Sequence, residues 1–149
     1  MKILNLTQHQ STPEQGVVDL PKTELDVATS IGLRPDQFGF YKDIGDVLTF
    51  RTPPTEGQMW SRAVLLAAVA AKHGADAAMI GGAPFFMSVL EKALAQRGIQ
   101  PLYAFSVRES VEAVQPDGSV VKTNVFRHVD FVKGTMFPIG LPEDGQEED

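Results

Sequence analysis

The chain has 149 residues, no cysteine and a formal net charge of -6. Without cysteine it can form neither a disulfide nor a thiolate metal site, and it has no cysteine nucleophile. The acidic balance argues against a broad surface for duplex nucleic acid, whereas a small phosphorylated ligand would need only a few local cations.

The composition indicates a single cytoplasmic domain, because 43% hydrophobic residues is typical of globular proteins of this length. The apolar run Ile3–Leu6 is too short for a signal peptide, and Ala63–Ala71 is too short to span a membrane. We therefore expect one domain over residues 1–141 and no membrane contact. Residues 142–149 are acidic and predict a disordered, dispensable tail.

The first third of the chain predicts short elements. The run Ile3–Leu6 predicts a buried strand, and Ser11–Glu14 carries the cap-type residues and the proline that open a short helix. The segment Leu20–Ile31 is a candidate for a further helix. A second strand is predicted at Asp46–Phe50, followed by Arg51–Pro54.

The middle of the chain alternates helices and strands. The strongest helix is predicted at Glu56–Lys72, and a third strand at Asp76–Ile80. The turn Gly81–Pro84 then opens a helix that ends near Arg97, and Leu102–Ser106 is a fourth strand. This order predicts a parallel sheet with right-handed crossovers.

The last third changes to an alternating pattern of side-chain types. Val107–Val114 and Val120–Val132 alternate on either side of the turn Pro116–Gly118, which predicts a hairpin or extended meander. The fold class expected is therefore α/β: a Rossmann-like, mostly parallel sheet flanked by helices, with a C-terminal β-hairpin. The helix segment Ala63–Ala71 is apolar on every side, so either a second copy or the Arg51–Pro54 segment should cover it.

Ligands of open α/β sheets collect beyond the carboxyl ends of the strands. This rule selects Thr7–Gln10, Arg51–Pro54, Gly81–Pro84 and Ser106–Ser110. In Gly81–Pro84 two glycines permit close approach of the backbone to a ligand, and the start of a helix suits phosphate. The alternative is a tight turn with glycine for packing.

His9 is the candidate for proton transfer, because histidine titrates near neutral pH and this one directly follows a strand. His73 and His128 fit structural roles, and no set of residues has the spacing of a metal site. Arg108 and Ser110 share a face of their strand. Arg108 can either hold phosphate or pair with a neighbouring glutamate.

Four stretches together resemble a known family. They are Leu6–Gln15, Arg108–Glu112, Pro116–Lys122 and Val125–Phe131. They are similar to the opening and closing motifs of small CRISPR-associated accessory proteins of type III systems, which have CARF-like Rossmannoid domains. The resemblance implies binding, and often ring-opening, of cyclic oligoadenylate second messengers.

This resemblance implies a metal-independent ring nuclease that works as a homodimer without a cofactor. A ribose 2′-hydroxyl attacks the adjacent 3′-phosphate and leaves a 2′,3′-cyclic phosphate, with His9 and Arg108 as the catalytic residues. The ligand-binding residues expected are Thr7, Gln8, Gln10, Gly81, Gly82, Ala83, Pro84, Ser106, Ser110 and Lys122. Two alternatives remain: a sensor that binds the messenger without cutting it, and an unrelated Rossmann-like nucleotide enzyme.

Overall fold

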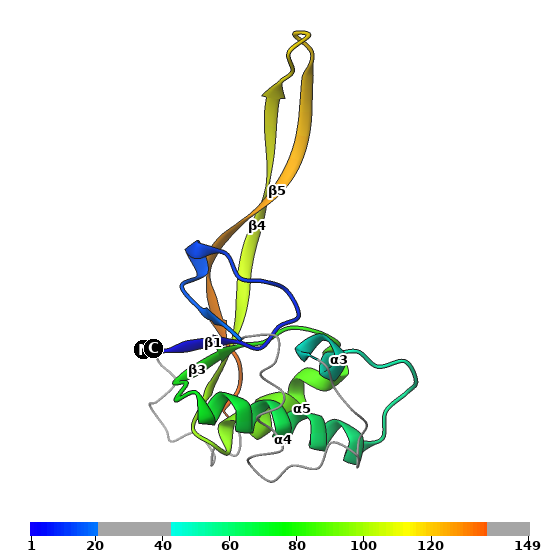
Figure 1. The fold of residues 1–149 in the computed structure, drawn as a ribbon, viewed down its shortest axis with the longest axis vertical. Helices are drawn as coiled ribbons and strands as arrows, with labels where there is room; N and C mark the ends of the chain where they lie inside the picture. Colours follow the sequence, from blue (N-terminus) through cyan, green and yellow to red (C-terminus); the bar gives the residue numbers. More distant parts are fainter. Residues whose placement is uncertain (21–42, 137–149) are drawn as a thin grey trace, which may run out of the picture.

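A computed structural model describes residues 1–20 and 43–136 of the chain (Figure 1). Within these ranges five strands form one sheet, in the order β2-β1-β3-β4-β5. The first four strands in that order run parallel to their neighbours, and β5 runs antiparallel to β4. The strands are β1 (Ile3–Asn5), β2 (Val18–Asp19), β3 (Ala77–Met79), β4 (Gln100–Val114) and β5 (Val120–Lys133). The helical elements are η1, a 3-10 turn (Pro13–Gln15), α3 (Ile44–Leu48), α4 (Glu56–Lys72) and α5 (Pro84–Ala95).

The predicted α/β class is confirmed, but only one part of the sheet is parallel. The parallel pairings are short: β1 and β3 have three residues each, and β2 has two. The antiparallel pair of β4 and β5 is far longer, with 15 and 14 residues. The sheet is therefore mixed, with a short parallel part that continues into a long antiparallel hairpin.

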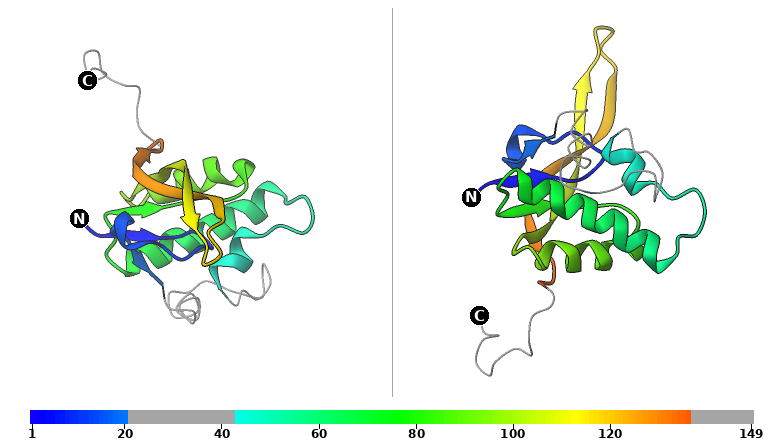
Figure 2. Two further views of the ribbon diagram at one scale, coloured as in Figure 1. Left: turned by 90° about the horizontal axis from the view of Figure 1, so that it is seen from above. Right: turned by 60° about the horizontal axis from the view of Figure 1, so that its bottom comes forward.

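The helices α4 and α5 lie together on one face of the sheet (Figures 1 and 2). The chain passes from β2 across β1 to β3, and then to β4 in the same direction, so crossovers of the same hand place both helices on the same face. The connection from β1 to β2 runs in the opposite direction and contains η1. The core is made of apolar side chains from the sheet and both helices, including Leu4, Leu6, Leu66, Val69, Ala78, Ile80, Phe86, Leu90 and Leu94.

Helix α4 has the limits that the sequence predicts. Thr55 precedes it and accepts a hydrogen bond from the Gln58 amide at 3.1 Å, while its own amide donates to the Gln58 side chain at 2.9 Å. The apolar run in its second half is buried within the chain, against α5 and the sheet. This run is therefore already buried in the single chain, with α5 beside α4 on the same face of the sheet (Figure 1), so it does not require a second copy or Arg51–Pro54 to cover it. The expected homodimer stays a prediction.

The prediction of a strand at Asp46–Phe50 is also wrong, because the first three residues of this segment belong to helix α3. The Asp43 side chain caps the helix by accepting a hydrogen bond from the Asp46 amide at 3.0 Å. Ile44, Val47 and Leu48 then lie on one helical face, with Val47 and Leu48 buried. A short apolar run of this kind suits either a strand or a helix, and here the aspartate cap favours the helix.

Strand β4 does not end at Ser106 as predicted. It has an irregular register with β5 between Phe105 and Ser106, and then runs on to Val114. Residues 106–128, which we call the arm, form a hairpin that projects far beyond the helices (Figure 1). Gly118 in its turn has φ 89°, a conformation that favours glycine.

Some expectations fall on parts of the chain that the structure does not describe. The helix candidate Leu20–Ile31 lies outside the described residues apart from Leu20, and the domain limit at 141 and the tail 142–149 lie outside them entirely. Where the chain is described, no helix combines the length and the apolarity that crossing a bilayer requires.

Candidate functional site

The polar residues after β1 meet the glycine turn after β3 at one edge of the sheet. The two strands are parallel neighbours with Asn5 paired to Met79, so the segments that follow them leave the same edge. The chain leaves β1 toward β2 on one side and returns to β3 on the other, which makes this edge the topological switch point. A pocket of about 350 Å³, here called the sheet-edge pocket, opens there. Its lining residues are Thr7, Gln8, His9, Gln10, Gln15, Met79, Ile80, Gly81, Gly82, Tyr103 and Ala104.

One buried side chain shapes the turn that carries His9. Asn5 is 4% exposed, and its amide nitrogen donates to the carbonyl of His9 and to the Asp19 carboxylate, both at 2.8 Å. Its carbonyl oxygen accepts from the amide of Thr7 at 2.9 Å and from the Thr7 hydroxyl at 2.7 Å. Asn5 therefore fixes the polar turn after β1, because its side-chain amide donates two hydrogen bonds and its side-chain oxygen accepts two.

Asp19 on β2 extends this network to the segment before η1. Its carboxylate accepts from Asn5 and from the amide of Ser11, at 3.2 Å to one oxygen and 3.4 Å to the other. Burial acts to raise the pKa of Asp19, but the hydrogen bonds from Asn5 and Ser11 outweigh it, so the net pKa is lowered.

Replacing Asp19 with asparagine should therefore change how stability depends on pH. Because the folded-state pKa lies below the ordinary value of 3.8, the ionised carboxylate stabilises the fold above that pH and loses this effect as the pH falls through the folded-state pKa. Urea unfolding measures the free energy of unfolding at pH 7 and at pH 3. Between these two pH values the wild type should lose more of it than Asp19→Asn does. Because Asp19 is exposed, the difference between the two losses should be less than about 1 kcal/mol. Equal losses would contradict this role of Asp19.

The glycine turn lets backbone form one wall of the pocket. Gly82 has φ 148°, and a Cβ there would lie 3.5 Å from the methyl group of Met87. Within the described residues, no hydrogen bond uses the amide of Gly81 or Gly82. Directly after them α5 begins with Pro84. The turn therefore offers two amides and the positive end of a helix dipole beside the pocket.

Tyr103 lines the pocket, and its hydroxyl is engaged with helix α5. The hydroxyl donates a hydrogen bond to the Glu91 carboxylate on α5. Burial raises the pKa of Tyr103 well above its ordinary value, and the negative charge of Glu91 raises it further. The hydroxyl therefore stays protonated and engaged with Glu91 at neutral pH.

His9 is then the candidate proton carrier of the pocket, since the described part of the lining has no lysine, arginine, aspartate or glutamate. His9 is exposed to solvent. Its carbonyl accepts hydrogen bonds from Asn5 and Thr7, at 2.8 and 3.1 Å. The main chain thus anchors the turn and leaves the imidazole available to a ligand.

The structure brings together one half of the predicted site. Thr7, Gln8, His9, Gln10, Gly81 and Gly82 all line the sheet-edge pocket. Ala83 and Pro84 follow in the same turn and at the start of α5, but they are not among the lining residues.

The other half lies on the arm, because β4 continues instead of ending at Ser106. Arg108 stacks over Phe126, with the guanidinium carbon 5.3 Å from the ring centre. Lys122 is paired with Glu112 at 3.8 Å, and Ser110 lies opposite Asn124 in the ladder. Ser106, Arg108, Ser110 and Lys122 do not line the pocket, so their role as ligand contacts stays a prediction.

The residues in and around the site that were not predicted include Asn5, Gln15 and Tyr103. Asn5 interrupts an apolar strand, and this buried polar position was the available signal. Gln15 accepts a hydrogen bond from the Thr12 amide at 3.1 Å, and its place in the pocket depends on how η1 folds back. Tyr103 lies inside a strand, and the sequence pattern does not show which face it occupies.

The segment Arg51–Pro54 lines a separate hollow of about 550 Å³, together with Phe50, Met59 and Phe85. It follows a helix rather than a strand, so it does not reach the carboxyl edge of the sheet. The described lining of this hollow is mainly aromatic and aliphatic, with Arg51 and Thr52 as its polar members. The prediction that this segment shares the site is wrong.

Comparison with known families gives one match: residues 1–132 match the uncharacterized protein MJ1673 family. The chain belongs to this family. The matched range contains every residue that lines the sheet-edge pocket and ends one residue before the end of β5. Searches of the curated proteins and of the solved structures found no match. The family description assigns no chemistry, so function has to be argued from the pocket.

Proposed function

We propose that the chain binds a cyclic oligoadenylate at the sheet-edge pocket and opens its ring, in type III CRISPR antiviral signalling. The observation that supports this is the meeting of the His9 turn and the glycine turn at the switch point of the parallel strands. This placement is typical of nucleotide sites in Rossmann-like sheets. We also propose that the parallel part of the sheet is Rossmann-like. The CARF-like resemblance of the sequence supplies the ligand class.

The chemistry of the lining suits one nucleotide unit of such a ring. A volume of about 350 Å³ is at the small end of ligand pockets, which span about 300–1,000 Å³. The amides of Gly81 and Gly82 can donate to phosphate oxygens, while the amide side chains of Gln8 and Gln10 can bond the base or the ribose. The rest of the ring would lie outside this pocket, and a symmetric dimer would offer each copy an equivalent unit.

The proposed reaction needs a positioned hydroxyl and a proton carrier. The ribose 2′-oxygen forms a bond to the adjacent phosphorus as the bond from phosphorus to the 5′-oxygen breaks. His9 takes the proton from the 2′-hydroxyl or gives one to the departing 5′-oxygen. The products are a 2′,3′-cyclic phosphate and a free 5′-hydroxyl on one linear chain. Arg108 and Lys122 remain predicted phosphate contacts for the part of the ring outside the pocket.

Filling the pocket tests where the ligand binds. A Cβ at Gly81 would lie 3.6 Å from the Thr7 methyl group, an ordinary contact, so Gly81→Val should fold normally and occupy pocket space. We expect it to weaken binding of cyclic oligoadenylates by at least about tenfold, measured by titration calorimetry over several ring sizes. The melting temperature should stay close to that of the wild type.

The matched control is Gly57→Ala on α4, where the nearest atom to an added Cβ is 4.0 Å away and no pocket residue is involved. This variant should bind like the wild type. If Gly81→Val also binds like the wild type, the ligand lies elsewhere on the chain. If the wild type binds no cyclic oligoadenylate, the proposal is wrong.

A further inference from the structure

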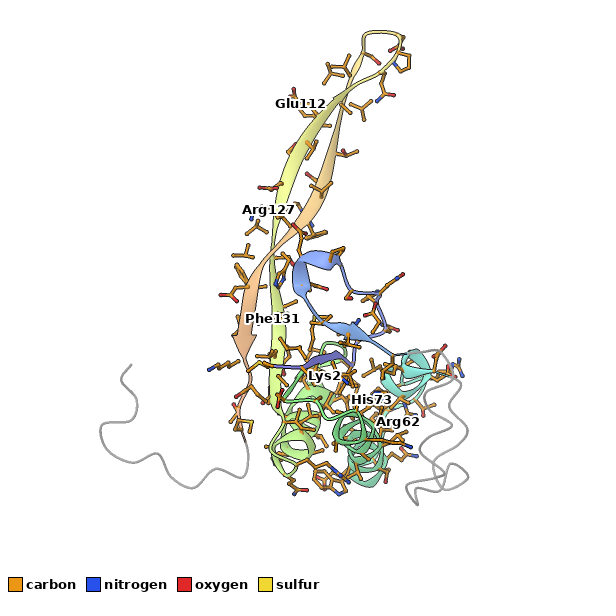
Figure 3. All side chains as sticks on the ribbon, turned by 60° about the vertical axis from the view of Figure 1, so that its left-hand side comes forward. Lys2, Arg62, His73, Glu112, Arg127 and Phe131 are labelled. Carbon is orange, nitrogen blue, oxygen red and sulfur yellow. The ribbon has the colours of Figure 1, made fainter. Side chains whose placement is uncertain are left out.

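Several apolar side chains of the arm are exposed to solvent, because nothing else in the described part of the chain covers them. Val111 and Val121 are each 43% exposed, and Val125 is 42% exposed. Figure 3 shows the side chains of the arm, among them Glu112 and Arg127, standing away from the body. A two-stranded hairpin of this kind is marginal by itself in water, so a partner surface would stabilise it.

The ladder of β4 and β5 separates the arm into two faces. Directly paired residues lie on the same face, and successive residues of a strand alternate between faces. One face, here called the valine face, is made mainly of small and β-branched side chains. Its members are Val107, Val111, Ala113, Val121, Thr123 and Val125, with the ion pair of Glu109 and Arg127 at 3.0 Å near its root. Faces of this composition form the inner layers of packed sheets.

The charges of the arm do not suit a strongly charged partner. It carries three basic and three acidic side chains, which are Arg108, Lys122, Arg127, Glu109, Glu112 and Asp117. Two of these pairs are formed within the arm, at 3.0 and 3.8 Å. A nucleic acid would need an excess of basic groups, whereas a second arm requires only that like charges do not face each other.

The two strands of the arm carry charged side chains but continue along the arm without interruption. Pro116 is confined to the turn, and the register irregularity lies at the root, so neither interrupts the two strands along the arm. Proteins that remain monomeric blunt such edges with proline, bulges or inward-pointing charges. The basic and acidic side chains of the arm balance, so two arms that meet through the valine face do not repel each other through a net charge.

We infer that the valine face of the arm is a dimerisation surface, which packs against the valine face of a second copy about a twofold axis. This inference does not depend on the ligand of the sheet-edge pocket. Nine ladder positions from Ser106 to Val114 give a face about 30 Å long and about 10 Å wide, so about 300 Å². This is below the roughly 800 Å² per partner of tight complexes, so the dimer should form at micromolar concentration or above.

Sedimentation of the full chain over about 1–300 µM tests this inference. We expect the mass to rise from 16.2 kDa toward twice that value. Val111→Asp should raise the dimer dissociation constant by at least about 30-fold, because the axis brings two added charges together. The matched control is Ser110→Asp on the opposite face, which should dimerise like the wild type. A monomer at every concentration, or equal effects of both variants, would overturn the inference.

A second measurement guards against a hairpin variant that fails to fold. The chain has no cysteine, so single cysteines can be introduced without background. Thr123→Cys, on the valine face, should give dimers with a short bis-maleimide cross-linker, while its neighbour Asn124→Cys, on the other face, should not. The reverse pattern, or cross-linking at neither site, would overturn the inference.

Discussion

Replacing His9 with alanine should slow ring opening by about 10²–10⁴-fold and leave the affinity for the cyclic oligoadenylate nearly unchanged. A proton carrier acts mainly in the transition state, so its loss reduces the rate rather than binding. Single-turnover cleavage and equilibrium binding, measured on the same variant, separate the two effects.

The structure makes this variant a clean test, because the turn does not depend on the imidazole. Asn5 and Thr7 hold the turn through the His9 carbonyl, which alanine also provides. Where the chain is described, no hydrogen bond uses the His9 side chain. The melting temperature of His9→Ala should therefore match that of the wild type within a few degrees.

The matched control is His128→Ala, since His128 packs against Phe131 near the root of the arm, with ring centres 4.8 Å apart, and does not line the pocket. Its cleavage rate should stay near that of the wild type. Cleavage by His9→Ala at the wild-type rate would remove His9 from the mechanism, while the binding proposal for the pocket would remain.

Replacing Asn5 with alanine should have the largest effect on stability among the residues around the pocket, about 2–4 kcal/mol in the free energy of unfolding. The substitution removes the acceptor of the Thr7 amide next to a buried strand. Within the described residues, it also leaves the His9 carbonyl with Thr7 alone and the Asp19 carboxylate with Ser11 alone as donor. Urea unfolding at pH 7 measures the loss. Because the polar turn loses its anchor, ligand binding should weaken in the same variant.

Two comparisons sharpen this prediction. Asn5→Asp keeps an acceptor for the Thr7 amide but places a second carboxylate beside Asp19, so it should be less stable at pH 7 than at pH 4. Asn124→Ala, on the exposed arm, should change stability by no more than about 0.5 kcal/mol. An Asn5→Ala variant as stable as Asn124→Ala would show that the network does not hold the turn.

The sequence predicted those parts of the fold whose signals are local. The limits of α4 follow from Thr55 before it and from the basic residues and Gly74 at its end. The two-residue strand β2 has no such signal, because it is identified only by its pairing with β1. Helix α3 was missed for a similar reason, because a short apolar run has no local signal that separates a helix from a strand.

The sequence predicted the part of the candidate site that depends only on which strands are neighbours. Thr7–Gln10 and Gly81–Gly82 meet because β1 and β3 are parallel neighbours, which follows from the alternation of helices and strands. The expected position of Arg108 assumed that β4 ends near Ser106. Nothing in the alternating pattern marks where the body ends and the arm begins, because both sides of that boundary have the period of a strand.

The most direct test of the central proposal is product analysis after the wild-type chain is incubated with cyclic oligoadenylates of several ring sizes in EDTA. We predict linear oligoadenylates ending in a 2′,3′-cyclic phosphate, formed by the wild type and only slowly by His9→Ala. A ring that is retained but recovered intact would contradict ring opening and favour a sensor. A ring that is neither retained nor converted would contradict both binding and cleavage at the sheet-edge pocket.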